Sequence, residues 1–239
     1  MPSSAARSEL APAGTLRAAI NFGNPVLAGK DASGQPCGIS VDLAREVGRR
    51  LGVAVALVHY ESAGHVPAAI ASNAWDVCFL AIDPKRAADI AFTEPYAVIE
   101  GAYMAAESSA LRGVDEVDRA GTRIGVIEGS AYDLYLTREL RQATLVREAS
   151  AEAVMNLWVE GMLDVVAGVK PQLETDAARI GGLRLLPGRF MSINQAMGTL
   201  RGREAGAGYL REFIAEAKSS GLVAELFARH RITGATMAD

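Results

Sequence analysis

Short apolar segments alternate with longer amphipathic segments along most of the chain, and this alternation restricts the possible folds. Residues 77–82 and 124–127 are apolar runs of strand length, and residues 16–20 are apolar except for Arg17. Residues 40–51 instead carry apolar side chains at helical spacing. Strands that alternate with helices of about ten or more residues are typical of an α/β protein with mostly parallel sheets. In such proteins, ligands bind near the carboxyl ends of the strands and the N-termini of the helices.

The same criteria predict the remaining elements. We expect further strands at residues 53–58, 101–106, 163–169, 183–186 and 195–200. We expect further helices at residues 66–72, 130–140, after Ser150, after Pro171, at 203–219 and at 221–230. Ser40 and Ser150 are expected N-caps, Gly52 is an expected helix end, and residues 1–14 are expected to form a loose lead-in.

Composition argues against several kinds of protein. The chain has 239 residues, of which 50% are apolar and 22% charged, and this suits one large α/β domain or two small ones. The net charge of −4, without a basic stripe, argues against a nucleic-acid partner. No uncharged apolar stretch approaches the ~18 residues that a membrane span needs. Residues 1–9 lack the apolar core of a signal peptide, so we expect either a removed leader or a protein that is not exported.

The cysteines and histidines give no sign of a metal site. Cys37 and Cys78 match no metal-binding spacing, and a lone pair this far apart is a weak disulfide signal, so free thiols are expected. The three histidines are scattered, and no two of them share a helical face four residues apart. No P-loop or dinucleotide fingerprint is present either. We therefore expect neither a metal nor another cofactor.

Five local sequences occur in the order and at the spacings of one bacterial family. They are GISVDLA (38–44) with LGV (51–53), AWDV (74–77), IDPKR with IAFTEPY (82–96), IGVIEGS (124–130) and GMLDVV (161–166). The segment at 82–96 is the most specific of the five. From residue 16 to about residue 230, the chain resembles the bacterial extracellular solute-binding proteins of the polar amino acid type.

This resemblance implies a type II periplasmic-binding fold with two α/β lobes joined by two crossing strands. Lobe 1 would comprise residues 1–101 plus 196–239 and lobe 2 residues 102–195, with the ligand in a cleft between them. Closure would then be a hinge motion about the two strands. The resemblance also implies a non-catalytic, monomeric component of an ABC importer with a permease partner and a periplasmic location. The missing signal peptide leaves a cytoplasmic location open.

Arg86 and Ser130 are the leading candidates for ligand contacts. The resemblance implies that Arg86 grips a ligand carboxylate, and a guanidinium offers a planar fork of donors that matches one. The alternative for Arg86 is a solvated surface arginine. Ser130 follows a glycine at an expected helix start, so its hydroxyl and the backbone N–H groups of Ser130 and Ala131 would suit an anion. Ser130 could equally be a plain N-cap.

Four positions depart from the pattern of the family, among them Ala63, which stands where an aromatic pocket wall is typical. Amino-acid binders of the family typically carry an aspartate, facing the α-ammonium of the ligand, where this chain has Val169. An ammonium buried without a carboxylate would be costly. Asn24 stands near a position that is usually aromatic, and Ala81 stands where Ser or Thr is common, although its backbone could still serve. We therefore hypothesise a ligand with a carboxylate but no α-ammonium, or one whose cationic group is placed differently.

Several other residues are candidates for the rest of the pocket. Glu128 and Glu100 are possible replacement anions, with solvated glutamates as the alternative. Neutral hydrogen bonds could come from Asn21, Asn24 and Gln195. Phe22 and Tyr132 could add apolar wall, although single aromatic residues more often belong to a core.

Two other functions on the same fold remain open. One is a cyclohexadienyl-dehydratase-like lyase, which needs a general acid in the site, and Glu128 is the one suitable candidate. The other is a ligand sensor, although the sequence contains no fused signalling segment. Nucleophilic hydrolysis is disfavoured because no G-x-S-x-G elbow occurs.

Overall fold

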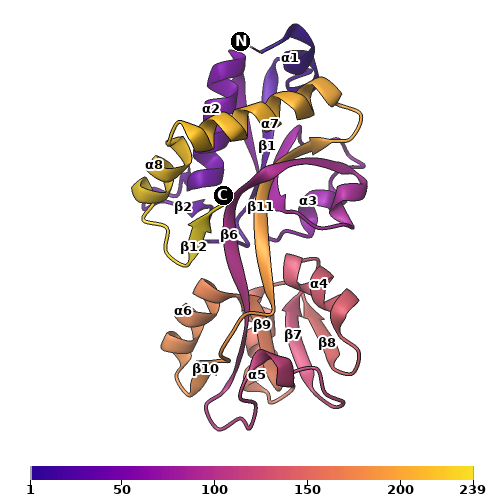
Figure 1. Ribbon diagram of the computed structural model, residues 1–239, viewed down its shortest axis with the longest axis vertical. Helices are drawn as coiled ribbons and strands as arrows, with labels where there is room; N and C mark the ends of the chain where they lie inside the picture. Colours follow the sequence, from indigo (N-terminus) through magenta and orange to yellow (C-terminus); the bar gives the residue numbers. More distant parts are fainter. Residues whose placement is uncertain (1, 239) are drawn as a thin grey trace. The chain divides into compact units, whose positions relative to one another are not determined.

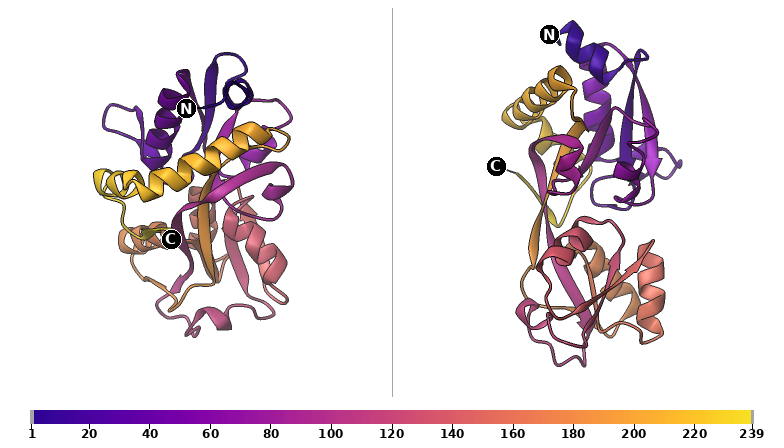
Figure 2. Two further views of the ribbon diagram at one scale, coloured as in Figure 1. Left: turned by 45° about the horizontal axis from the view of Figure 1, so that its top comes forward. Right: turned by 90° about the vertical axis from the view of Figure 1, so that its right-hand side faces the viewer.

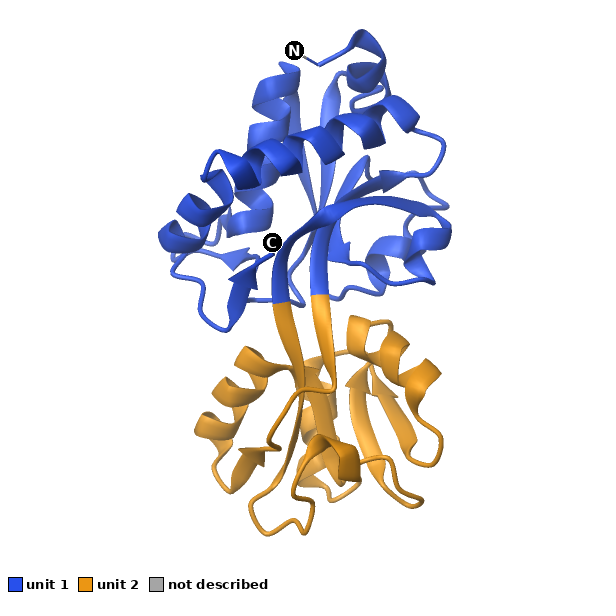
Figure 3. Cartoon of the chain, viewed as in Figure 1, with its two compact units in different colours: residues 1–98, 194–239 blue, residues 99–193 orange. Residues whose placement is uncertain are grey.

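The computed structural model describes residues 2–238, and the chain divides into two compact units (Figure 3). Unit 1 comprises Met1–Val98 and Asn194–Asp239, and unit 2 comprises Ile99–Ile193. The chain passes between the units within β6 (Ile90–Ala106) and again within β11 (Met191–Leu200). The passages expected from the sequence follow residues 101 and 195, and those in the structure follow residues 98 and 193.

Unit 1 is built on a sheet with the strand order β4-β1-β5-β11-β6. Figure 1 labels β1, β11 and β6 of this sheet. The central strand β1 (Thr15–Asn21) runs parallel to both β4 (Ala54–Tyr60) and β5 (Val77–Ala81). β11 runs antiparallel to β5, and β12 (Ala235–Met237) pairs with β6. The carboxyl ends of β1, β4 and β5 therefore share one edge of the sheet, the edge at which ligands of α/β proteins usually bind.

The helices of unit 1 follow the apolar pattern of the sequence with two differences. These helices are α2 (Ile39–Leu51), α3 (His65–Ala68), α7 (Glu204–Ser219) and α8 (Leu222–Arg229). Ser40 is not the N-cap of α2, because its hydroxyl is buried and forms a 3.2 Å hydrogen bond with the Tyr96 hydroxyl; the cap is Gly38. Gly52 ends α2 as predicted, with φ +67°. α3 is shorter than predicted because the chain continues as turns after Ala68.

The expectation of a loose lead-in at residues 1–14 is wrong, because α1 (Ser4–Leu10) forms there. The Ser3 hydroxyl accepts from the Ala6 N–H at 3.1 Å, and Leu10 is fully buried. The Glu9 carboxylate accepts from the Gly206 N–H at 2.7 Å, in the first turn of α7. Figure 2 shows α1 lying beside α7 from two further sides. Tertiary packing thus stabilises a helix in a segment whose composition suggested no regular secondary structure.

Unit 2 has the strand order β10-β6-β9-β7-β8. Its central strand β7 (Arg123–Ile127) runs parallel to β8 (Thr144–Glu148) and β9 (Val165–Val169), whereas β6 is antiparallel to β9 and β10 (Leu183–Leu185). The sequence did not predict β8, an edge strand with polar ends. The helices are α4 (Ala131–Glu139), α5 (Ala151–Val159) and α6 (Lys170–Ile180) (Figure 1).

The smaller elements lie mostly in the segments that connect the main strands and helices. They are β2 (Gly29–Lys30), β3 (Pro36–Cys37), and the 3₁₀ turns η1 (Arg86–Ala88) and η2 (Val114–Glu116). Cys37 and Cys78 are both free, as expected, and Cys78 is buried. Within residues 2–238, no helix is long and apolar enough to cross a membrane.

The same arginine–aspartate contact occurs once in each unit. In unit 1, the N–H and Nε of Arg17 donate to Asp76 at 3.1 and 2.8 Å, and the Asp76 N–H donates to the Arg17 carbonyl. In unit 2, the N–H and Nε of Arg123 donate to Asp164 at 2.8 and 3.0 Å, and the Asp164 N–H donates to the Arg123 carbonyl. Each contact joins the start of the central strand to the residue before a parallel neighbour. We call these two contacts the strand staples.

Candidate functional site

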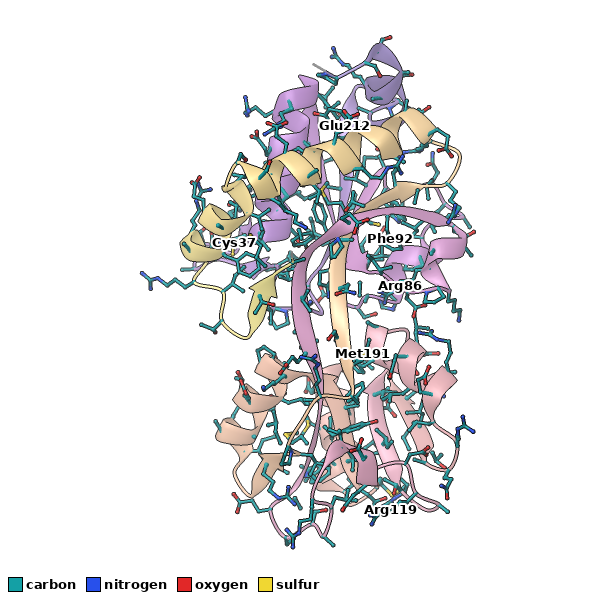
Figure 4. The ribbon with its side chains drawn as sticks, viewed as in Figure 1. Cys37, Arg86, Phe92, Arg119, Met191 and Glu212 are labelled. Atoms are coloured by element: carbon teal, nitrogen blue, oxygen red, sulfur yellow. The ribbon has the colours of Figure 1, made fainter. Side chains whose placement is uncertain are left out.

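Arg86 lies in the η1 turn that follows β5 (Figure 4). The residue is only 4% exposed, and one of its terminal nitrogens donates to the Ala81 carbonyl at 2.9 Å. Burial lowers the pKa of the Arg86 guanidinium to about 10, while the nearby Asp83 carboxylate opposes this shift. The guanidinium therefore stays charged at neutral pH in surroundings with little water. It is a fixed cation at the carboxyl end of β5.

Asp83 is a residue of this turn to which the sequence analysis gave no role. It is 3% exposed, its Oδ1 accepts from the Lys85 N–H at 2.8 Å, and its carbonyl accepts from the Ala87 N–H at 2.8 Å. The signal that could have found it is the spacing of three residues between Asp83 and Arg86, which brings two side chains to one side of a tight turn.

The register of β11 places Gln195 opposite Ala81. Gln195 is 7% exposed, and the Ile82 N–H donates to the Asn194 carbonyl at 2.8 Å. Three predicted site residues, Ala81, Arg86 and Gln195, are therefore close neighbours at one edge of unit 1.

The segment after β1 supplies three more predicted residues with different surroundings. The Asn21 Oδ1 accepts from the Gly23 N–H at 3.0 Å, so it stabilises the turn. The Phe22 ring stacks on His59 with the ring centroids 5.0 Å apart, and Lys30 Nζ lies 5.4 Å from the Phe22 centroid. Asn24 is 8% exposed, and its buried Oδ1 has no hydrogen-bond partner among the described residues. Of the three, Asn24 retains an unused acceptor.

In unit 2, Ser130 caps α4 as the sequence predicts. Its hydroxyl accepts from the Asp133 N–H at 3.1 Å. The Asp133 carboxylate in turn accepts from the Gly129 N–H at 2.8 Å and from Arg147 Nε at 2.9 Å. The N–H groups of Ala131 and Tyr132 belong to the first turn and have no acceptor within the helix. The helix N-terminus thus has donors for an anion, beside the Asp133 carboxylate that the sequence analysis missed.

The side chain of Tyr132 is nearly buried at 7% exposure. Burial raises the pKa of its phenol, which therefore stays neutral. Tyr132 is therefore a neutral residue at the start of α4 that suits the wall of a pocket or the core.

Val169 ends β9 and stands opposite Gly101 of β6. The neighbouring Glu100 has two cationic partners within unit 2, Lys170 Nζ at 2.8 Å and a terminal nitrogen of Arg189 at 3.2 Å. Hydrogen bonds from Lys170 and Arg189 lower the pKa of Glu100. A carboxylate is thus present near Val169, but two side chains of the protein already pair with it.

Glu128 follows β7 and is exposed. Its backbone N–H donates to the Glu148 carbonyl at 2.9 Å, which fixes the backbone before the α4 cap. The structure records no ion pair of Glu128 with another described residue. Within residues 2–238, no group of three or more His, Cys, Asp and Glu residues could hold a metal ion.

The predicted residues therefore lie near the carboxyl ends of parallel strands in each unit. Those of unit 1 are Asn21, Phe22, Asn24, Ala81, Arg86 and Gln195. Those of unit 2 are Glu128, Ser130, Ala131, Tyr132 and Val169.

Solved structures identify the class of fold. A solute receptor for L-cysteine from Neisseria gonorrhoeae matches with a TM-score of 0.83 at 17% identity, covering 99% of this chain and 100% of that one. A mutant of ArgBP from T. maritima matches with a TM-score of 0.79 at 20% identity, covering 95% and 99%. The ancestral amino acid-binding protein AncCDT-1, a precursor of cyclohexadienyl dehydratase, matches with a TM-score of 0.76 at 18% identity, covering 93% and 98%. The fold is that of the type II periplasmic-binding proteins, mixed α/β with sheets flanked by helices.

A family model extends this result from fold to family. The model for bacterial extracellular solute-binding proteins, family 3, matches residues 16–232, and the chain belongs to this family. The resemblance predicted from the five local sequences is therefore confirmed. A search of curated proteins finds no match.

Proposed function

We propose that this protein is the solute-binding component of an ABC importer and that it binds a small carboxylate-bearing solute. It acts as a monomer, without a cofactor and without catalysis, outside the cytoplasmic membrane, and hands its solute to a membrane permease. Membership of a family of extracellular solute-binding proteins supports this role. An amino acid ABC transporter protein from Streptococcus pneumoniae, AbpA, is an L-arginine-bound structural neighbour at 19% identity.

The buried guanidinium of Arg86 is the observation that carries the proposal. A guanidinium keeps its charge even when it is buried, so it can attract an anion where little water competes. Arg86 is 4% exposed, follows the carboxyl end of β5, and points one terminal nitrogen at the Ala81 carbonyl. This contact orients the planar guanidinium, which suits two parallel hydrogen bonds to a carboxylate.

We further propose that residues of both units contact the same solute. The α4 N-terminus would supply the backbone N–H groups of Ala131 and Tyr132 and a favourable dipole for a second part of the solute, whereas the Ser130 N–H already donates to the Ile127 carbonyl at 3.1 Å. Solute that binds residues from two units favours the conformation in which both sets reach it, and this coupling is the basis of hinge closure about β6 and β11.

The proposed solute lacks an α-ammonium group. The neutral side chain of Val169 provides no charge for one, and Lys170 and Arg189 already neutralise Glu100. A ligand ammonium would have to displace one of these two cations. Glu128 is then the one predicted carboxylate left for a cationic group placed elsewhere.

Calorimetry with purified protein tests the proposal. The titrants are the standard amino acids, the 2-oxo and 2-hydroxy acids of the same carbon skeletons, and simple organic acids. We expect binding of acids without an α-ammonium and no tight binding of α-amino acids. Tight binding of an ordinary α-amino acid would contradict the ligand assignment.

The role of Arg86 is tested with Arg86→Met and Arg86→Lys. We expect Met to reduce carboxylate affinity by about a hundredfold or more and Lys to restore little of it, because an ammonium lacks the planar fork. Arg119→Met is the matched control, since Arg119 is exposed and pairs only loosely with Glu116 at 3.4 Å. Equal affinity in Arg86→Met and wild-type protein would contradict the assignment.

A lyase is the second candidate function. Glu128 is exposed and follows the last residue of β7, beside the helix N-terminus proposed for anion binding. A structural neighbour at 18% identity is a precursor of cyclohexadienyl dehydratase. Incubation with cyclic hydroxy-carboxylates separates the two functions. Water elimination that Glu128→Gln abolishes would favour the lyase, and binding without turnover would favour transport.

A further inference from the structure

Two opposite charges are buried within one turn of unit 1. Asp83 is 3% exposed and Arg86 is 4% exposed, and only two residues lie between them in the sequence. The Asp83 Oδ1 accepts from the Lys85 N–H at 2.8 Å, and an Arg86 terminal nitrogen donates to the Ala81 carbonyl at 2.9 Å. Short contacts to neighbouring backbone therefore anchor both side chains near the end of β5.

The proximity of these charges affects what Arg86 can bind. The Asp83 carboxylate raises the pKa of Arg86 against the larger opposing effect of burial, so the two charges interact electrostatically. A carboxylate that approaches Arg86 is attracted by the guanidinium and repelled by Asp83. In a poorly hydrated site, both effects are larger than in water. A bare carboxylate therefore gains less at this arginine than at an arginine without an acidic neighbour.

A second feature of the same sheet edge points to a hydrogen-bond donor on the solute. The buried Oδ1 of Asn24 has no partner among the described residues, and β1, which precedes it, is the parallel neighbour of β5. A buried acceptor left without a donor costs about 1–3 kcal/mol. A solute hydroxyl or amide would satisfy it, whereas an added positive charge is not required.

We propose that Asp83 is a specificity-determining residue that selects hydroxy-carboxylates over bare carboxylates at Arg86. This inference rests on the proposed function and names the class of its solute. Asp83 disfavours acids that offer only negative charge. A hydroxyl next to the carboxylate offsets the penalty, because its one hydrogen can be donated to an acceptor of this edge, either Asp83 or Asn24.

The first experiment compares acid pairs that differ by one hydroxyl: acetate with glycolate, and propionate with L-lactate. Affinities are measured by calorimetry at constant ionic strength for wild-type protein and Asp83→Asn. Asparagine keeps an oxygen for the Lys85 N–H but removes the negative charge. We expect acetate to bind Asp83→Asn about tenfold or more tightly than wild type, and the preference for glycolate over acetate to fall by a similar factor.

Asp83→Ser is a second variant, because serine can also accept from the backbone N–H two residues on. Asp89→Asn is the matched control, since Asp89 lies in the same turn but is exposed. Thermal unfolding of each variant checks its folding. A purely structural role of Asp83 predicts lower stability with an unchanged ratio of glycolate to acetate affinity, and that result would overturn the inference.

The outcomes separate this inference from the proposed function. Arg86-dependent carboxylate binding with no effect of Asp83→Asn overturns the inference alone. Acetate binding that appears only in Asp83→Asn, and disappears on adding Arg86→Met, supports the inference even if the wild-type solute is not in the panel. No binding of any of the four acids to wild type or to either Asp83 variant overturns the inference, while the wider panel still tests transport.

Discussion

At the scale of single residues, burial decides which of two similar contacts matters more. The two strand staples have nearly the same geometry, but the Asp76 side chain is fully buried whereas the Asp164 side chain is 43% exposed. Asp76 also accepts from Arg203 at 2.9 Å. Removing one partner of a buried ion pair leaves a charge without compensation, whereas exposed pairs contribute little.

We therefore expect Asp76→Asn to lower the free energy of unfolding by about 3–5 kcal/mol and Asp164→Asn by under about 1 kcal/mol. Chemical denaturation measures both values. Similar effects of the two substitutions would contradict the role of burial.

The stability from Asp76 should depend on pH. Burial opposes ionisation of this carboxyl, but hydrogen bonds from Arg17 and Arg203 outweigh it and lower the pKa below its ordinary value of 3.8. A carboxyl with a lowered folded-state pKa stabilises the fold above its unfolded-state pKa, and this stabilisation is lost as pH falls through the folded-state value. Wild-type stability should therefore fall more steeply below pH 3.8 than that of Asp76→Asn. Parallel pH profiles would contradict this.

The sequence predicted part of the candidate site, and geometry explains the rest. Arg86 and Ser130 stand in recognisable local sequences, so their positions at the end of β5 and the start of α4 could be predicted. Asp83 and Asp133 could not be identified in the same way, because the role of a carboxylate depends on which backbone N–H groups and arginines surround it in the fold. The pairing of Glu100 with Lys170 and Arg189 likewise joins residues far apart in sequence.

At the scale of elements, two serine N-caps allow a role in helix stability to be separated from a role in solute binding. Ser130 and Ser150 each accept the N–H of the third residue on at 3.1 Å, but only Ser130 lies at the proposed ligand site. Ser130→Ala and Ser150→Ala should each cost about 1 kcal/mol of stability. Only Ser130→Ala should also weaken solute binding in calorimetry. Equal solute affinity of the two variants would mean that Ser130 serves only as a helix N-cap.

Helix α1 provides a second prediction at this scale. Leu10→Ala should lower the free energy of unfolding by about 2–5 kcal/mol, because Leu10 is fully buried in unit 1. Arg7→Ala, an exposed residue of the same helix, is the control. A negligible effect of Leu10→Ala would mean that α1 does not dock in solution.

Most of the other elements could be predicted, because hydrophobic periodicity marks buried strands and long helices well. The prediction of secondary structure failed for elements that form only because of tertiary contacts. The edge strand β8 and the first part of β6 contain polar residues, and their backbones are ordered by neighbouring strands that periodicity does not reveal. α1 forms because α7, nearly two hundred residues away, provides its partner Gly206.

At the scale of the whole molecule, we propose that solute binding affects residues of both units. Hydrogen exchange tests this coupling. Saturating solute should slow amide exchange at the η1 turn of unit 1 and at the start of α4 in unit 2, and Arg86→Met should abolish both effects. Protection confined to unit 1 would show that one unit holds the solute alone.

The order of the chain has a further consequence for how the protein is made. Unit 2 is one continuous segment, whereas unit 1 needs its last part, Asn194–Asp239, to place Arg203 on Asp76 and Gly206 on Glu9. A ribosome releases residues from the N-terminus onward, and domains generally fold as units. The first hundred residues must therefore wait, incompletely folded, until unit 2 has emerged and the C-terminal helices follow. During synthesis, the second unit in sequence can be the first to become stable.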